Sequence, residues 1–76
     1  MNVQFNSVDQ RISYSISCKN TNIFVDIEEI FINKYPEYKD KEIYYMVNSF
    51  KVRRFKTIEE NRIKNNDKII VYIYDE

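Results

Sequence analysis

The spacing of the apolar residues changes between residues 18 and 24, and this change constrains the fold more than any other feature of the chain. Over residues 12–18, apolar residues occupy every second position and serines fill the positions between them. Such alternation predicts a strand with one buried face. The next apolar residues recur at helical spacing: Phe24, Ile27, Ile30 and Phe31. An amphipathic helix therefore follows the strand, and its apolar stripe must pack on the apolar face of a sheet.

The helix is predicted over residues 23–34. Asn22 is suited to cap the backbone N–H groups of the first turn. Three acidic residues follow it: Asp26, Glu28 and Glu29. Their charge suits the positive end of the helix dipole. Pro36 prevents the helix from continuing.

Alternation predicts further strands on both sides of the helix. Val3 and Phe5 begin a hairpin over residues 2–18, and later strands are expected at 42–47, at 50–52 and from Ile69 to Tyr74. The residues expected to face inward are Ile12, Tyr14, Ile16, Cys18, Ile43, Tyr45, Val47, Ile69, Val71 and Ile73. The long connection through the helix favours a mixed sheet. We therefore predict an α+β fold with four or five strands packed on one helix.

Length and composition indicate a single globular domain over residues 1–76. A chain of 76 residues has no material for a second core, and 43% hydrophobic residues are too many for a disordered tail. No apolar run approaches the roughly 20 residues that span a membrane, and the N-terminus has no secretory signal. We therefore expect a soluble intracellular protein, with the cytoplasm or nucleus favoured and an organelle not excluded.

The chain contains no glycine. Turns that require a positive φ must then use asparagine or aspartate, which tolerate it best after glycine. The residues placed where such turns are expected are Asp9, Asp40, Asn48, Asn65 and Asn66.

The segment TIEENRIKNNDKIIVYI, residues 57–73, is the most distinctive part of the chain. Thr57 and Glu60 have the spacing of a capping box, and Ile58 and Ile63 follow as apolar residues before the alternating last strand. This pattern, together with the hairpin and the helix, resembles the ubiquitin family over residues 3–73. The resemblance implies a β-grasp fold.

The chain departs from that family at its end. It closes on Tyr74, Asp75 and Glu76, where conjugated members and sulfur carriers have two glycines, and Phe50 stands where ubiquitin has a chain-building lysine. The resemblance therefore implies a ubiquitin-like domain that is not conjugated.

Residues for catalysis are scarce. There is no histidine, and Cys18 is expected to be a small buried residue. The adjacent pairs Glu28-Glu29 and Glu59-Glu60 diverge on a helix instead of converging on a substrate. Metal-ligand spacing and a glycine-rich phosphate loop are also absent from the sequence. We expect no enzyme activity, no cofactor, no metal and no small-molecule substrate.

Binding is the function that remains. Five residues are expected to point outward from neighbouring strands: Tyr44, Met46, Ile70, Tyr72 and Tyr74. The first four are the expected contacts of the partner. The resemblance places Met46 and Tyr72 at the recognition patch of ubiquitin and Val8 near its hairpin-tip leucine. Tyrosine and methionine suit interfaces, although strands also favour aromatic residues on any face.

Three functions follow from this pattern. The first is a module that binds a protein partner through the outward residues, and the second is a small structural subunit fixed in a multiprotein complex. The third, nucleic-acid binding, would use the basic cluster Lys51, Arg53, Arg54 and Lys56. Because 12 basic and 12 acidic residues give no net charge, we expect this cluster to be a solvated edge and a nucleic-acid partner to be unlikely.

Overall fold

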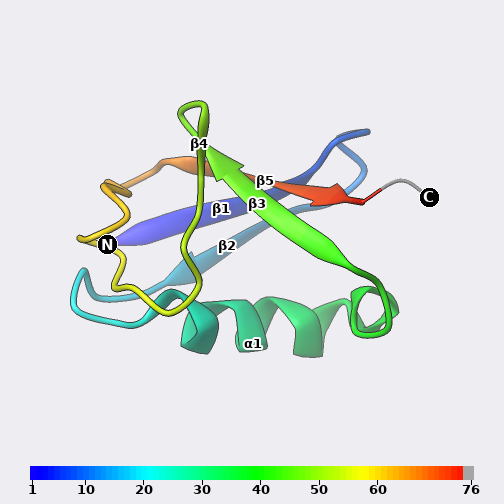
Figure 1. The fold of residues 1–76 in the computed structure, drawn as a ribbon, viewed down its shortest axis with the longest axis horizontal. Coiled ribbons are helices and arrows are strands. Elements are labelled where there is room, and N and C mark those ends of the chain that lie inside the picture. The colour runs from blue at the N-terminus through cyan, green and yellow to red at the C-terminus, as the bar shows by residue number, and fades with distance from the viewer. Residues whose placement is uncertain (75–76) are drawn as a thin grey trace.

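A computed structural model describes residues 1–74 of the chain. It contains five strands, one α-helix and one short 3-10 helix (Figure 1). In chain order they are β1 (Asn2–Ser7), β2 (Ser13–Ser17), α1 (Phe24–Lys34), η1 (Pro36–Tyr38), β3 (Ile43–Val47), β4 (Phe50–Lys51) and β5 (Lys68–Ile73). The predicted α+β class is confirmed.

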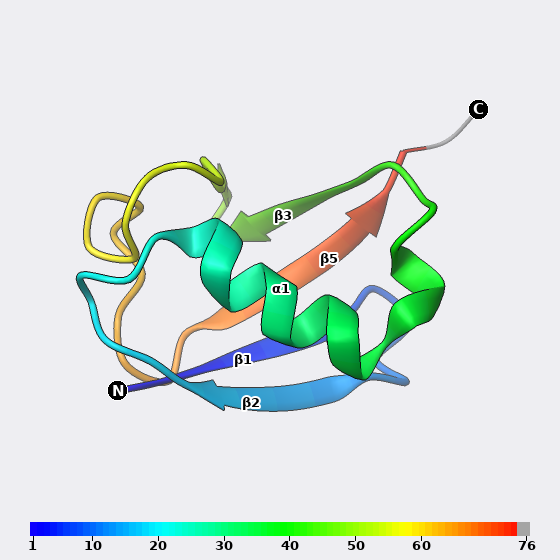
Figure 2. The ribbon, with the colours of Figure 1, turned by 90° about the horizontal axis from the view of Figure 1, so that it is seen from below.

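The strands form one mixed sheet in the order β2-β1-β5-β3-β4. β1 and β5 are parallel, and every other neighbouring pair is antiparallel. α1 lies across one face of this sheet, as Figure 2 shows from the helix side. The first and last strands of the chain, β1 and β5, are thus parallel neighbours at the centre of the sheet. Together with the β1–β2 hairpin and the helix that follows it, this is a β-grasp-like arrangement.

The core lies between α1 and the covered face of the sheet. Aromatic rings form its centre: the ring centroids of Phe5 and Phe31 are 4.7 Å apart, and those of Phe24 and Tyr45 are 5.1 Å apart. Phe5 itself pairs with Ile69 in the parallel register of β1 and β5. Most of the predicted inward residues are buried here, Cys18 included.

Two predicted inward residues are exposed instead. Ile30 is 45% exposed, because at 3.6 residues per turn it lies about 120° around the helix from Phe24, whereas Glu28 lies only about 40° away. Glu28 accordingly occupies the buried stripe. Ile73 is exposed at the end of β5, where β1 no longer accompanies it, since the pairing of β1 with β5 ends at Ser7 and Val71.

The start of α1 is capped by another part of the chain and not by Asn22. The N-cap residue is Ile23, which makes no side-chain cap, and the side-chain oxygen of Asn22 accepts a hydrogen bond from the Lys19 N–H instead. The first N–H groups of the helix, at positions 24 and 25, donate to the carbonyls of residues 56 and 54, each at 2.9 Å. The predicted Asn22 cap is therefore wrong.

The capping box at the last turn is confirmed. The Thr57 N–H donates to the Glu60 carboxylate at 2.9 Å, and the Glu60 N–H donates to the Thr57 hydroxyl at 3.0 Å. These bonds start the turn that delivers Ile58 and Ile63 into the core.

Among residues 1–74, positive φ angles occur at Gln10, Asn48, Ser49, Arg62 and Asn66. Asn48 and Ser49 form the two-residue turn between β3 and β4, which requires positive φ at both positions. The predictions for Asn48 and Asn66 are confirmed, and those for Asp9, Asp40 and Asn65 are wrong. Asp9 and Asn65 use their side chains as hydrogen-bond acceptors in these turns instead.

No helix in residues 1–74 combines the length and the apolar character needed to cross a lipid bilayer. The prediction that the domain is not conjugated rests on the last residues of the sequence, of which Asp75 and Glu76 lie outside the described residues.

Candidate functional site: the open face of the sheet

The sheet has one face covered by α1 and one open face in the described part of the chain (Figures 1 and 2). On the open face, Tyr44 of β3 lies directly opposite Tyr72 of β5, and Met46 lies opposite Ile70. All four side chains are half-buried. The structure thus brings together four of the five residues predicted to point outward.

Three tyrosines form an aromatic cluster at one end of this face: Tyr44, Tyr72 and Tyr74. The rings of Tyr44 and Tyr72 are stacked with centroids 5.1 Å apart, and those of Tyr44 and Tyr74 are 4.6 Å apart. Offset stacking of this kind stabilises neighbouring rings beyond their buried area. The cluster therefore presents a continuous aromatic surface.

Lys51 belongs to the same face, which the sequence analysis missed. It lies opposite Met46 in the pairing of β3 with β4. Its ammonium nitrogen Nζ donates to the Tyr74 hydroxyl at 2.7 Å and lies 5.3 Å from the centroid of the Tyr44 ring. The two-residue turn at Asn48-Ser49 was the available signal, because it fixes which residues of the two strands are opposite each other.

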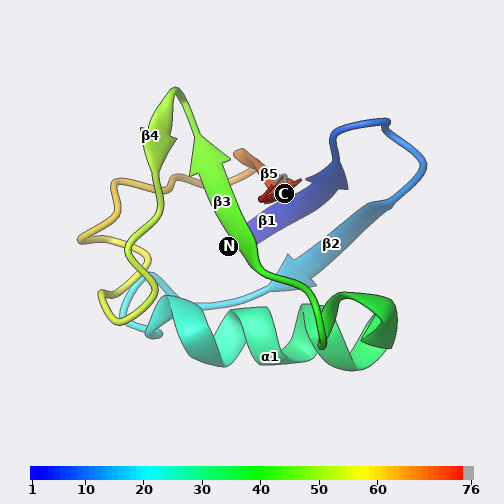
Figure 3. The ribbon, with the colours of Figure 1, turned by 45° about the vertical axis from the view of Figure 1, so that its right-hand side comes forward.

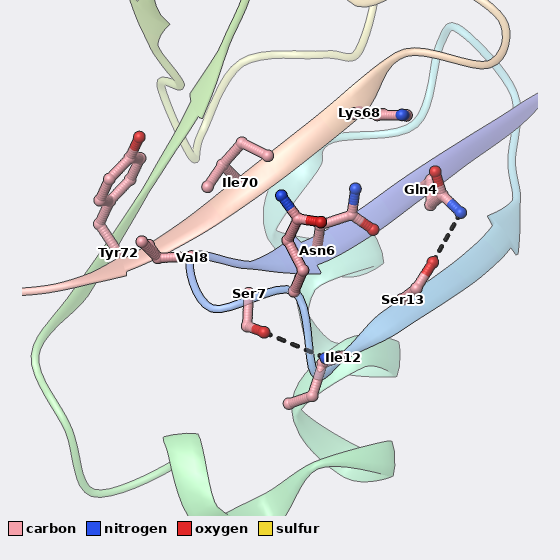
Figure 4. A pocket seen from close by; sticks show the side chains of 10 residues that line it. Gln4, Asn6, Ser7, Val8, Ile12, Ser13, Lys68, Ile70 and Tyr72 are labelled. Atoms are coloured by element: carbon pink, nitrogen blue, oxygen red, sulfur yellow. Dashed lines mark hydrogen bonds between the residues drawn. The ribbon is translucent and has the colours of Figure 1, made fainter.

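Val8 stands at the tip of the β1–β2 hairpin and is exposed. It lines a groove of about 450 Å³ together with Ile70 and Tyr72. Figure 4 shows these three side chains on one side of the groove, which we call the hairpin groove. The hairpin tip and the β3–β4 hairpin stand on either side of β5 (Figure 3). All five predicted partner-binding residues thus lie on one continuous surface.

The hairpin tip has a fixed geometry. The Ser7 hydroxyl donates to the Asp9 carboxylate at 2.6 Å and accepts a hydrogen bond from the Ile12 N–H at 3.1 Å. The same Asp9 oxygen accepts from the Arg11 N–H. The bond from Ser7, followed by that from Arg11, lowers the pKa of the Asp9 carboxyl. These contacts hold the loop that carries Val8.

The other side of the hairpin groove is polar. Gln4, Asn6 and Ser13 line it from β1 and β2, and the Gln4 side-chain N–H donates to the Ser13 hydroxyl at 2.7 Å (Figure 4). The open face therefore divides into an aromatic and aliphatic half over β3, β4 and β5 and an amide and hydroxyl half over β1 and β2.

The basic cluster does not converge on one site. Lys51 extends over the aromatic cluster, whereas Arg54 turns inward and lies 2.7 Å from the Glu28 carboxylate. The Arg53 guanidinium donates to the carbonyl of Glu60. The segment 51–56 thus directs three of its cations to three different surroundings.

Glu28 is a buried carboxylate, whereas the sequence analysis assigned it only to the positive end of the helix. It accepts hydrogen bonds from the Tyr45 hydroxyl at 2.6 Å and from Arg54 at 2.7 Å. Burial, followed by this bond to Glu28, raises the pKa of the Tyr45 hydroxyl. The helical spacing from Phe24 and Phe31 was the signal that could have found this network.

No protein-family model and no curated protein matches the sequence. The likeness to ubiquitin therefore rests on the order of the elements and on the pattern of buried residues.

Residues 1–74 contain no group of three or more histidine, cysteine, aspartate or glutamate side chains arranged to hold a metal ion. Cys18 is buried, and burial raises the pKa of its thiol, which keeps it protonated and unreactive. The surface of the open face is the feature with the clearest capacity to bind.

Proposed function

We propose that this chain is a non-catalytic ubiquitin-like interaction module that binds a protein partner through the open face of its sheet. The observation that carries the proposal is the direct cross-strand pairing of Tyr44 with Tyr72 and of Met46 with Ile70 on a face that α1 does not cover.

The chemistry of these side chains supports a protein partner. Tyrosine and methionine supply apolar area together with a polar or adaptable group, and both are enriched at protein interfaces. Lys51 adds a cation held beside the aromatic cluster. A strand that only faced solvent could carry threonine or lysine at these positions at little cost.

The proposal predicts that substitutions on the open face separate binding from stability. Met46→Ala and Tyr72→Ala should each change the free energy of unfolding by no more than about 1 kcal/mol, because surface substitutions rarely do more. Each should weaken partner binding by about 1 kcal/mol or more if the face is a hot spot. The measurements are thermal unfolding and affinity for the partner recovered from native cells.

Two control variants complete this experiment. Ser15→Ala changes an outward side chain of β2, on the opposite half of the sheet, and should alter neither quantity. Ile16→Ala removes a buried side chain and should lower the free energy of unfolding by about 2–5 kcal/mol. Unchanged affinity in folded Met46→Ala and Tyr72→Ala would reject the open face as the binding site.

A second candidate function is a structural subunit fixed in a larger assembly. The observation that favours it is the exposure of two phenylalanines outside the open-face pairs: Phe50 is 65% exposed and Phe55 is 80% exposed. A subunit covered on several sides should aggregate when purified alone, whereas an independent module should be a soluble monomer. Light scattering after size-exclusion chromatography distinguishes the two.

A further inference from the structure

The outer edge of β2 carries backbone groups that bond to no other strand of residues 1–74. β2 ends the sheet on one side, next to β1 (Figure 2). The bonds that join this hairpin involve even-numbered residues along β2: the Cys18 N–H donates to the Met1 carbonyl at 2.8 Å, and the Ile12 carbonyl accepts from the Ser7 N–H at 3.1 Å. Antiparallel bonding alternates along a strand, so the residues between them direct their N–H and C=O groups away from β1. These residues are Ser13, Ser15 and Ser17, and all three are exposed.

This edge lacks the features that usually keep a strand edge from pairing. Those features are charged side chains, proline, bulges and very short edge strands. The sequence of β2, SYSIS, contains no charge and no proline, and its register with β1 is unbroken from Ser13 to Ser17. β4, at the other side of the sheet, has only two residues, Phe50 and Lys51. β2 is therefore the edge at which this sheet can accept another strand.

The flank of α1 beside this edge presents an exposed apolar side chain. The Lys34 ammonium nitrogen Nζ lies 5.9 Å from the centroid of the Tyr14 ring, which places the end of α1 beside β2. Ile30 lies one turn before Lys34 on the same flank of the helix, and it is 45% exposed. A strand added to β2 would bring other side chains against this isoleucine and reduce its exposure.

The residue pattern of β2 is complementary to itself. In an antiparallel pair with a twofold axis at Ser15, Ser13 lies opposite Ser17 of the second copy, and Tyr14 lies opposite Ile16 of the second copy. Serine pairs of this kind can hydrogen-bond across the strands, and pairs of an aromatic with a β-branched residue are favourable. The pattern thus pairs like with like on the face of the serines and packs apolar side chains together on the face of α1.

The charge of β2 also favours a second copy as the occupant. A twofold axis brings any charge on the strand close to its own copy, so a strand that pairs with itself must be neutral. β2 meets this condition. The nearest charges along the chain, Arg11 and Lys19, lie outside the strand, and Arg11 forms an ion pair with Asp9 at 3.5 Å.

We propose that this protein forms a twofold dimer by antiparallel pairing of β2 with β2 of a second copy, centred on Ser15. The two sheets become one continuous sheet, with both copies of α1 on the same face. The outward N–H and C=O groups of β2 bond to those of the second copy. The inference goes beyond the proposed function, because the residues proposed to bind a partner lie on β3 and β5 and stay uncovered in this dimer.

The expected affinity is low. Strands of five residues bury less surface than the roughly 1,200 Å² of stable interfaces, so we expect a Kd of about 0.1 mM. At the micromolar concentrations of size-exclusion chromatography the protein is then a monomer.

The first test is self-association of the unsubstituted protein. In sedimentation equilibrium between roughly 10 µM and roughly 1 mM, a range that brackets the expected Kd, the average mass should rise from 9.4 kDa toward twice that value. In ¹⁵N–¹H NMR spectra over the same range, the backbone amide signals of Ser13, Ser15 and Ser17 should shift, whereas those of Met46 and Tyr72 should not. A monomer at the highest concentration would overturn the inference and leave the edge to a strand of another protein. Shifts confined to Met46 and Tyr72 would also overturn it.

The second test is a charge swap at the twofold axis. Because the axis places Ser15 opposite itself, Ser15→Lys and Ser15→Glu should each weaken self-association about fivefold. An equimolar mixture of the two variants should associate more tightly than either variant alone, since lysine then lies opposite glutamate. Glu29→Gln changes the net charge by the same amount as Ser15→Lys, at an exposed position of α1, and should leave the Kd unchanged.

Two results of the charge swap would contradict the inference. Self-association that is unchanged in Ser15→Lys would exclude the β2 edge as the interface. A mixture that associates no more tightly than the separate variants, each shown to be folded by circular dichroism, would exclude pairing centred on Ser15. Both results would leave the proposed function standing, because none of these variants changes Met46 or Tyr72.

Discussion

At the scale of single residues, short polar contacts decide how the hairpin tip is held. Asp9 is exposed, yet its carboxylate accepts hydrogen bonds from the Ser7 hydroxyl and the Arg11 N–H. Arg11 also forms an ion pair with Asp9 at 3.5 Å between two exposed side chains. Exposed ion pairs contribute little in water, so the hydrogen bond from Ser7 should dominate.

If the hydrogen bond from Ser7 affects Asp9 more than the ion pair with Arg11 does, two variants should change the pKa of Asp9 to different extents. Ser7→Ala should raise the pKa of Asp9 toward its ordinary value by more than Arg11→Gln does, because the Ser7 bond is the largest cause of the lowered pKa. Since the pKa of Asp9 is lower in the folded protein, its stabilising effect is complete above the unfolded pKa and is lost as the pH falls through the folded pKa. Carboxyl ¹³C NMR titration measures both variants. A larger change in Arg11→Gln would reverse this assignment.

At the scale of elements, the loop from β4 to the last turn holds the start of α1. Its carbonyls accept the first helical N–H groups, and Arg54 reaches Glu28 one turn into the helix. The Tyr45 hydroxyl from β3 meets the same carboxylate. Three elements that are distant in sequence are therefore joined at one buried group.

A double-mutant cycle tests this junction. Glu28→Leu leaves the buried Tyr45 hydroxyl without an acceptor and should lower the free energy of unfolding by about 1–3 kcal/mol. Tyr45→Phe should have a smaller effect, because the Glu28 carboxylate keeps Arg54, whose side chain is 39% exposed. The double variant should lose less than the sum of the two, since the Tyr45 hydroxyl that Glu28→Leu leaves without an acceptor is then absent. Additive losses in urea unfolding would mean that the two side chains act independently.

At the scale of the whole molecule, the distribution of charge opposes a nucleic-acid function. The chain has no net formal charge, and its basic cluster is divided between the open face, the buried Glu28 and the loop surface. A nucleic-acid site would need these cations on one face.

We therefore predict no specific affinity for RNA or DNA at physiological salt. Fluorescence anisotropy with labelled single-stranded RNA and duplex DNA at two salt concentrations measures it. The diagnostic variant combines Arg53→Glu with Lys56→Glu and spares Arg54, because changing Arg54 would disturb the Glu28 network. Submicromolar binding that weakens with salt and disappears in this variant would establish a nucleic-acid function instead.

The sequence by itself determined the local structure and most of the buried residues. Hydrophobic spacing depends only on near neighbours along the chain, so the strands, the helix over residues 24–34, the Asn48-Ser49 turn and the Thr57–Glu60 capping box could be predicted. Much of the candidate site followed from the same alternation, because residues between inward positions must face outward. Tyr44, Met46, Ile70 and Tyr72 were found in this way.

Only the tertiary structure decided what depends on contacts between distant segments. Ile73 is exposed because β1 ends beside Val71, and Asn22 does not cap α1 because loop carbonyls from residues 54 and 56 already accept its first N–H groups. Glu28 is buried because Tyr45 and Arg54 meet it from two other elements. Strand register and the packing of α1 set these contacts, and with them the hairpin groove around Asn6, which no local pattern of residues encodes.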